Sequence, residues 1–250
     1  MRPAARGGAA GALAFGAAAA YASPLLGVVP SIGTRFTPAL VGCGRSGHVA
    51  LSFDDGPDAL STPAILEALA TLGWRATFFM LGTMARRAPG LAREVAEAGH
   101  EVAVHGDVHR NMARRTPRAV ADDIQRARDT IAATSGVEPR WFRPPYGALS
   151  WPALFAARRL GLSTVLWTAW GRDWRSEATP ATVVADVLRG RFDRGTILLH
   201  DSDCTSAPGS WRSTFGALPI LAEELALRGL DVGPVGEHGI VERRSPVKSP

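Results

Sequence analysis

Residues 48–57 read HVALSFDDGP, an apolar run that ends in two consecutive aspartates, a glycine and a proline. Further β-rich runs follow it and are predicted to be strands, at residues 76–80, 101–104, 141–142, 163–167 and 196–199, with a weaker one near 230–232. Helical periodicity occupies the stretches between them, at about 61–72, 88–98, 117–134, 150–160, 180–190 and 214–228. This alternation predicts an α/β fold with a parallel sheet and crossover helices, either an open doubly wound sheet or a barrel.

Polar and aromatic residues follow five of the predicted strands. They are Asp54 and Asp55 after the first, His105 and His109 after the third, Arg143 and Tyr146 after the fourth, Asp173 and Trp174 after the fifth, and His200 after the sixth. In parallel α/β folds the carboxyl ends of the strands meet at one face, where the adjoining loops converge. The five segments are therefore predicted to form one site.

Asp55, His105 and His109 are candidate metal ligands. Two imidazoles and one carboxylate leave coordination positions open for water and substrate, as a catalytic divalent ion requires. Gly106 lets the chain bend sharply after its strand, which helps both histidines to face one ion. Taken alone, the histidines could be surface residues and DDGP could be a turn. Two consecutive carboxylates at the end of an apolar strand, however, repel each other unless a cation or a shared proton relieves the repulsion.

Asp54 and His200 are candidate acid–base groups. If Asp55 is a metal ligand, Asp54 beside it can accept a proton from metal-bound water, whose pKa zinc lowers to about 7. His200 ends a buried strand and can protonate a leaving amine. The remaining histidines lie at a strand start, in a turn and in the tail, and are interpreted as structural or solvent-exposed: His48, His100 and His238.

The chain has 250 residues, with 28 Lys or Arg against 23 Asp or Glu and a formal net charge of +5. This composition excludes an intrinsically disordered chain and a polytopic membrane protein, and two cysteines, Cys43 and Cys204, exclude a disulfide scaffold. The arginines are scattered and not interleaved with aromatic residues, which argues against a nucleic-acid partner. No feature indicates a protein partner, and the positive charge favours at most an association with an anionic cell envelope.

Residues 1–30 are interpreted as an export segment. Arg2 and Arg6 precede an uncharged run rich in Ala, Gly and Leu, with a small-x-small triplet at 20–22, as in a secretory signal peptide or a single membrane anchor. The alternative is an Ala-rich extension of a cytosolic protein. Residues 31–47 are predicted to be a linker and 236–250 a polar tail. We therefore expect the protein to be secreted or anchored to the outer face of the membrane.

Five motifs occur in order along the chain: SFDDGPD at 52–58, HGDVH at 105–109, FRPPYG at 142–147, RDW at 172–174 and ILLHDSD at 197–203. Together they resemble the polysaccharide deacetylases of carbohydrate esterase family four, which share the NodB homology domain. The resemblance covers about residues 48–235 as one catalytic domain, and it implies a distorted (β/α) barrel, often with seven strands. It also implies metal-dependent removal of N-acetyl, sometimes O-acetyl, groups from a glycan such as a chitooligosaccharide or peptidoglycan, with release of acetate. The ion is usually zinc, and cobalt, nickel or manganese can substitute.

The resemblance also implies a role for each motif residue. Asp54 resembles the general base, Arg143 resembles the residue that orients it, and Asp55, His105 and His109 resemble the metal ligands. His200 resembles the general acid, and Asp173 resembles the carboxylate that orients this histidine. Tyr146 resembles a substrate contact and backbone oxyanion donor, and Trp174 and Leu198 resemble the walls of the acetyl pocket. Trp211, in a Gly-Ser-Trp segment after the acid histidine, is an added candidate for sugar binding. Trp167, Trp170 and Trp174 could also stack on sugar faces, although a core position is the favoured interpretation for Trp167 and Trp170. Cys204 is interpreted as a small packed residue.

Two positions depart from the family pattern. Ser52 stands where the family commonly has threonine, and Gly106 stands where it usually has Ser or Thr. In the family, the hydroxyl of the Ser or Thr at the position of Gly106 steadies the loop that carries the second histidine. We therefore expect either a less rigid His109, with weaker metal binding, or support of the loop by Asp107.

Two rival functions are compatible with the same residues. One is a metal-dependent amidohydrolase that acts on a small non-sugar amide, because this fold also serves such substrates. The other is a non-catalytic carbohydrate-binding relative, which is disfavoured because every catalytic position is occupied.

Overall fold

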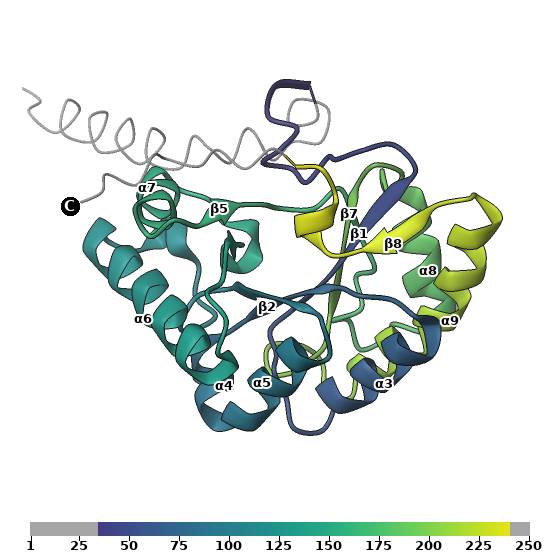
Figure 1. Ribbon diagram of the computed structural model, residues 1–250, viewed down its shortest axis with the longest axis horizontal. Coiled ribbons are helices and arrows are strands. Elements are labelled where there is room, and N and C mark those ends of the chain that lie inside the picture. The colour runs from purple at the N-terminus through teal and green to yellow at the C-terminus, as the bar shows by residue number, and fades with distance from the viewer. Residues whose placement is uncertain (1–34, 241–250) are drawn as a thin grey trace, which may run out of the picture.

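A computed structural model describes residues 35–240 (Figure 1). The predicted export segment at 1–30 and most of the predicted tail lie outside these residues. The strands are β1 His48–Asp54, β2 Thr77–Met80, β3 Glu101–Val104, β4 Trp141–Phe142, β5 Ser163–Thr164, β6 Ala169–Trp170, β7 Thr196–His200 and β8 Asp231–Gly233. The helices are α3 Thr62–Leu72, α4 Gly82–Arg87, α5 Pro89–Glu97, α6 Pro117–Ser135, α7 Trp151–Arg159, α8 Pro180–Arg189 and α9 Trp211–Leu227, with 3₁₀ turns η2 Met112–Arg114, η3 Pro145–Gly147 and η4 Val235–Glu237. Between residues 35 and 240, no helix is both long and apolar enough to span a membrane.

The sheet is parallel and curled. Its strands follow the order β5-β4-β3-β2-β1-β7-β6, and β8 pairs with the start of β1. Helices α3, α4, α5, α6, α8 and α9 lie around its outer side (Figure 1). The two ends of this order, β5 and β6, are not paired with each other in the described part of the chain. The arrangement confirms the distorted (β/α) barrel that the sequence predicts, and the open doubly wound alternative is wrong.

Strand β1 lies between β2 and β7 and is buried along its whole length, and its alternation of side chains directs Asp54. Val49, Leu51 and Phe53 belong to the large apolar cluster that the helices cover. Ala50 belongs to the smaller cluster inside the barrel, and Asp54, four residues later, points to the same face. In register, Asp54 lies opposite His200 of β7. The predicted base and acid therefore end neighbouring strands.

The predicted strand at 163–167 is wrong in its second half. Strand β5 ends at Thr164, and the chain then crosses to the other end of the sheet to form β6. The N–H of Leu166 donates to the carbonyl oxygen of Leu40 at 2.8 Å, so this segment pairs with residues that precede β1. Residues 163–167 look like one strand in the sequence, but only their first part pairs within the sheet, because the second part bonds to the segment before β1.

The described part of the predicted linker at 31–47 packs against the barrel. Val41 is buried, and the carbonyl oxygen of Gly42 accepts a hydrogen bond from the Thr196 hydroxyl at 2.8 Å. Gly44 donates its N–H to the carbonyl oxygen of Arg194 at 2.9 Å. Residues near 40–44 therefore belong structurally to the barrel, which the Gly- and Ser-containing composition did not indicate.

Side-chain caps fix the starts of two helices on the side where the strands end. Thr116 accepts the N–H of Ala119 at the start of α6. Thr179 and Thr182 form a capping box at the start of α8, and proline follows each cap. These caps satisfy N–H groups that the first helical turn leaves free. They therefore fix the residues at which α6 and α8 begin and the preceding loops end.

Candidate active site

One cavity of about 250 Å³ lies where β1 and β7 end. It is lined by the predicted residues Asp54, Asp55, His105, His109, Tyr146, Trp174, Leu198 and His200, and also by Trp167, Trp170, Thr205 and Ser206. The predicted Arg143 and Asp173 bond directly to Asp54 and His200. Five separate segments of the chain therefore meet in one site, as predicted.

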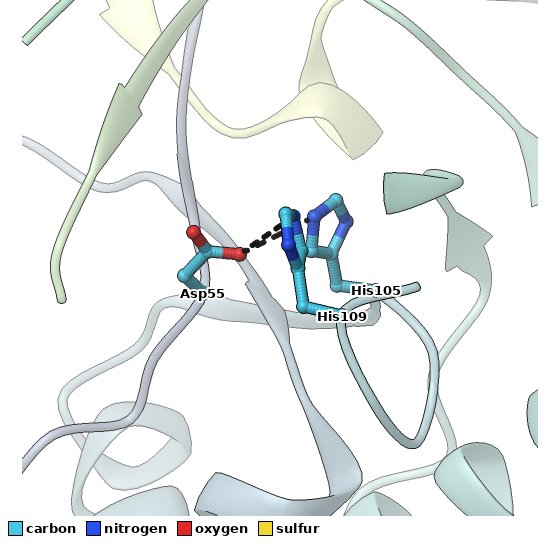
Figure 2. Close-up of side chains that lie close together, drawn as sticks. All are labelled: Asp55, His105 and His109. Carbon is cyan, nitrogen blue, oxygen red and sulfur yellow. Dashed lines mark ion pairs between the residues drawn. The ribbon is translucent and has the colours of Figure 1, made fainter. Parts of the chain in front are cut away.

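Asp55, His105 and His109 face one another (Figure 2). The Nε2 atoms of His105 and His109 lie 3.4 and 3.5 Å from Oδ1 of Asp55, and one ligand atom from each residue lies within 4.8 Å of the others. Oδ1 is buried and accepts no hydrogen bond from the described residues. A buried carboxylate oxygen without a partner is unfavourable unless a cation lies beside it. The three residues therefore fit a divalent metal ion.

Both histidines are prepared to act as neutral ligands. Nδ1 of His105 lies 2.9 Å from the carbonyl oxygen of Arg143, and since a carbonyl only accepts, this nitrogen carries the proton. The lone pair on Nε2 is then free on the side of Asp55. Burial lowers the pKa of His105 to about 3, although Asp55 opposes this, and burial also lowers the pKa of His109. Metal ligation requires the unprotonated nitrogen that these shifts favour.

Helix α6 supports the loop that carries these histidines. Gly106 has a φ of +104°, and a Cβ there would lie 3.1 Å from Oδ1 of Asp123. That buried oxygen accepts the N–H of Asp107 at 2.8 Å, and Oδ2 of Asp123 pairs with Arg115 at 2.7 Å. The Asp107 carboxylate pairs with Arg86 at 2.7 Å. Asp107 supports the loop as predicted, but it does so together with Asp123, which no motif indicates.

Asp54 is held by a buried arginine. Nη1 of Arg143 donates to Oδ1 of Asp54 at 2.7 Å and to the Ser52 hydroxyl at 2.9 Å. Nη2 of Arg143 donates to the carbonyl oxygen of Leu166 at 2.9 Å, and the guanidinium lies over the ring of Phe79. Burial raises the pKa of Asp54 above its ordinary value, and the charge of Arg143 opposes this rise. Arg143 thus orients the carboxylate and favours its ionised, proton-accepting form.

His200, which ends β7 beside Asp54, is held by Asp173. Nδ1 of His200 lies 2.9 Å from Oδ1 of Asp173. Oδ2 of Asp173 accepts the backbone N–H of His200 at 2.7 Å and the Thr214 hydroxyl at 2.5 Å. Burial disfavours a charged imidazole, but the carboxylates of Asp173, Asp55 and Asp54 together outweigh it and raise the pKa of His200 to about 10. His200 is therefore protonated at pH 7, as a general acid must be.

The aromatic wall of the cavity is larger than predicted. Trp174 and Leu198 line it as expected, and Trp167 and Trp170 line it as well, so their interpretation as core residues is wrong. The rings of Trp167 and Trp170 lie 5.9 Å apart, and those of Trp170 and Trp174 lie 5.2 Å apart. Both residues belong to the segment that leaves β5 and crosses to β6, and this crossing turns them toward the site.

Tyr146 and Trp211 differ in their position. Tyr146 has a φ of 60° in η3, is 64% exposed, and places its ring 4.3 Å from that of His109. It lines the cavity, and its role as an oxyanion donor stays a prediction. Trp211 begins α9, where its ring contacts Phe215 and Arg212, and it is not among the residues that line the cavity. Its sugar contact also stays a prediction.

The loop after β7 contacts the backbone of Asp55, a candidate metal ligand, and of Gly56 beside it. Cys204 is exposed, so its interpretation as a packed residue is wrong. Its Sγ nevertheless lies 3.5 Å from the carbonyl oxygen of Asp55, and desolvation raises the pKa of the thiol to about 11, which keeps it neutral. Asp201 accepts the N–H of Gly56 at 3.1 Å, and a Cβ at Gly56 would lie 2.0 Å from its carboxylate. Only glycine fits beside Asp201 at this position.

Comparison with known proteins agrees with this geometry. A sequence model of the polysaccharide deacetylase family matches residues 42–165. A chitooligosaccharide deacetylase of Bradyrhizobium sp. (strain ANU 289) is 34% identical over 195 residues, which are 75% of this chain and 88% of that protein. The chain belongs to the polysaccharide deacetylase family. Like its named deacetylase relatives, the chain is a hydrolase that acts on carbon–nitrogen bonds other than peptide bonds.

Solved structures of the family share the fold of this polysaccharide deacetylase. The Bc1960 peptidoglycan N-acetylglucosamine deacetylase superposes with a TM-score of 0.75 at 27% identity, covering 83% of this chain and 95% of that one. A family 4 carbohydrate esterase from Streptomyces lividans, solved in complex with acetate, gives a TM-score of 0.67 at 34% identity, covering 75% and 92%. The likeness extends over nearly the whole of both solved chains.

Proposed function

We propose that this chain is a metal-dependent deacetylase that removes N-acetyl groups from a glycan of the chitooligosaccharide or peptidoglycan type and releases acetate. One observation carries the proposal: the partnerless oxygen of Asp55 faces two neutral imidazoles, and an acid–base pair lies beside them in the same cavity. The names of the relatives support the substrate class, since they are deacetylases of these two glycans.

Asp55, His105 and His109 would hold the ion, and zinc suits two imidazoles and one carboxylate. When bound, such an ion polarises the amide carbonyl and acidifies water. Cobalt, nickel or manganese could replace zinc, since selection among divalent ions at such a donor set depends on geometry and metal availability more than on raw affinity. The fit rests on the buried, partnerless oxygen of Asp55 and on the low pKa of His105.

Proton transfer falls to the two groups that end β1 and β7. Asp54 accepts a proton from the attacking water while Arg143 keeps its carboxylate oriented. A carbon–oxygen bond forms at the acetyl carbon, and the carbon–nitrogen bond to the sugar then breaks. His200 gives its proton to the departing amine, and because Asp173 holds Nδ1, Nε2 is the atom left to donate. The products are acetate and a free amino sugar.

The aromatic wall favours a sugar over a small linear amide. Trp167, Trp170 and Trp174 line one cavity and are each partly exposed. Aromatic faces bury the apolar C–H groups of sugar rings, and indole N–H groups can bond to hydroxyls. We expect the acetyl methyl to lie against Trp174 and Leu198, as the family resemblance implies.

Acetate release tests this proposal directly. Protein stripped of metal and then restored with zinc is assayed on chitooligosaccharides, peptidoglycan fragments and small linear or cyclic amides. We expect activity only with metal and only on the acetylated glycans. Turnover of small amides but not glycans would instead favour the rival amidohydrolase, and full activity in the stripped protein would refute metal dependence.

We also propose that the protein is exported, because peptidoglycan, one of the two proposed substrates, lies in the cell envelope. The support is the run of uncharged residues that follows Arg2 and Arg6. Full-length chain expressed with a C-terminal tag is fractionated and treated with protease outside intact cells. Protection from the protease, with the tag found in the cytosol, would contradict export.

A further inference from the structure

The two oxygens of the Asp55 carboxylate have different surroundings. Oδ1 is buried, lacks a hydrogen bond and faces both histidines. Oδ2 accepts a hydrogen bond from the hydroxyl of Thr205 at 2.5 Å. We propose that Thr205 is a positioning residue for the metal site, which engages Oδ2 and leaves Oδ1 as the single donor oxygen. This inference rests on the proposed metal dependence.

Asp55 needs such support because its own backbone is strained. Its φ is +81°, in the left-handed region that disfavours a side chain by about 1 kcal/mol or more. Its N–H donates to the carbonyl oxygen of Phe79 at 3.2 Å, which fixes the backbone but not the carboxylate. Within residues 35–240, the Thr205 hydroxyl is the hydrogen-bond donor found for this carboxylate. Without it, the carboxylate could turn about its Cβ–Cγ bond, and neither oxygen would be held facing the two histidines.

Thr205 is well placed for this role because the loop around it is tied down on both sides. Before it, the N–H of Cys204 donates to the Ser202 hydroxyl at 3.1 Å. After it, the N–H of Ser206 donates to the carbonyl oxygen of Asp203 at 3.0 Å, and the N–H of Ala207 donates to that of Trp174 at 3.0 Å. The branched Cβ of threonine also restricts its χ1. The hydroxyl is therefore pre-positioned, and little rotational freedom is lost when it bonds.

A hydroxyl in this position suits a metal ligand chemically. A hydrogen bond to the second oxygen of a ligating carboxylate fixes its orientation, and such outer partners affect metal affinity by about 10- to 100-fold. The bond is neutral-to-charged, which is the stronger kind. The same loop leads directly from His200, so one segment carries the acid and also orders a ligand on the other side of the cavity.

The test compares two substitutions at one exposed position. Thr205→Val removes the hydroxyl and keeps the branched shape, whereas Thr205→Ser keeps the hydroxyl. Zinc affinity of the metal-free proteins is measured by competition with a chelator, and thermal unfolding is recorded without metal. We expect Thr205→Val to weaken zinc binding about 10- to 100-fold and Thr205→Ser to stay within about 3-fold of wild type. The unfolding temperature without metal should fall by no more than a few degrees, as the loss of one hydrogen bond at an exposed threonine predicts.

Thr71→Val is the matched control, because Thr71 is also exposed and its hydroxyl donates to a carbonyl oxygen of its own helix at 3.0 Å. It should leave zinc affinity unchanged. Equal zinc affinity of Thr205→Val and wild type would overturn the role of Thr205 and leave the proposed function standing. Thr205→Ser binding as weakly as Thr205→Val would also overturn it, since the hydroxyl would then not be the cause. A folded wild-type protein that binds no zinc would overturn the metal dependence itself.

Discussion

The two sides of the cavity are built differently. On the acid–base side each reactive group already has a buried partner, with Arg143 on Asp54 at 2.7 Å and Asp173 on His200 at 2.9 Å. On the metal side the ligand atoms face one another at 3.4 to 3.5 Å, and Asp55 Oδ1 and Nδ1 of His109 are buried without a hydrogen-bond partner. The buried polar groups of the acid–base side are paired within the protein, whereas those of the metal side need a bound ion to be paired. Substitutions should therefore separate catalysis from metal binding.

The largest effect is expected from the metal side. His105→Ala and His109→Ala each remove one of three ligands, so we expect both loss of bound zinc and loss of measurable turnover. Metal content by mass spectrometry of the purified proteins measures the first, and acetate release measures the second. Zinc content equal to wild type in either variant would refute the ligand set.

The next largest effect is expected from Asp54→Asn. The amide cannot accept the proton from water, so turnover should fall by about 10²- to 10⁴-fold. Zinc content should remain as in wild type, because Asp54 is not one of the three ligands. Asp129→Asn, on the exposed side of α6, is the matched control and should change neither quantity. If Asp54→Asn keeps its activity, Asp54 is not the base.

A smaller effect, visible mainly in the pH profile, is expected from Asp173→Asn. His200 must be protonated to act as the acid, so activity should fall as the pH rises through its pKa of about 10. Asp173 contributes most to raising this pKa, ahead of Asp55 and Asp54, and its removal should let the pKa fall. The alkaline limb of kcat/KM should therefore move to lower pH. An unmoved limb would show that another group sets it.

The smallest effect on the site is expected from its outer support. Asp123→Ala removes a buried partner of both Arg115 and the N–H of Asp107, so the free energy of unfolding should fall by about 3 kcal/mol. Zinc binding should weaken by about 10-fold, because the histidine loop loses its hold on α6. Asp122→Ala, at the neighbouring and more exposed position, should cost less than about 1 kcal/mol. Denaturant unfolding and chelator competition measure the two quantities, and identical behaviour of the two variants would contradict the supporting role.

Much of the site was predictable because the chemistry lies in short segments directly after strands. Asp54 and Asp55 end an apolar run, and parallel strands bring such ends together whatever the loops do. The histidines, Arg143, Asp173 and His200 were found by the same reasoning together with the family motifs. Trp167 and Trp170 were misplaced because an aromatic residue in an apolar run looks alike whether it faces the core or a cavity.

The supporting residues were not predictable for a different reason. Asp123 and Thr205 act on residues 16 and 150 positions away, in other segments of the chain. An aspartate in a helix or a threonine in a polar loop is typical of an exposed surface. The segment near residues 40–44 was also missed, because its composition is that of a linker and only its hydrogen bonds place it on the barrel.

The sequence by itself determined the alternation of strands and helices and the identity of the reactive groups, because periodicity and strand ends are local properties of the chain. The tertiary structure alone decided which oxygen of Asp55 is left unpaired, which tryptophans face the cavity and which outer residues steady the histidine loop. Those features depend on contacts between separate segments, 16 residues apart for Asp107 with Asp123 and 150 for Asp55 with Thr205, and no local pattern encodes such a contact.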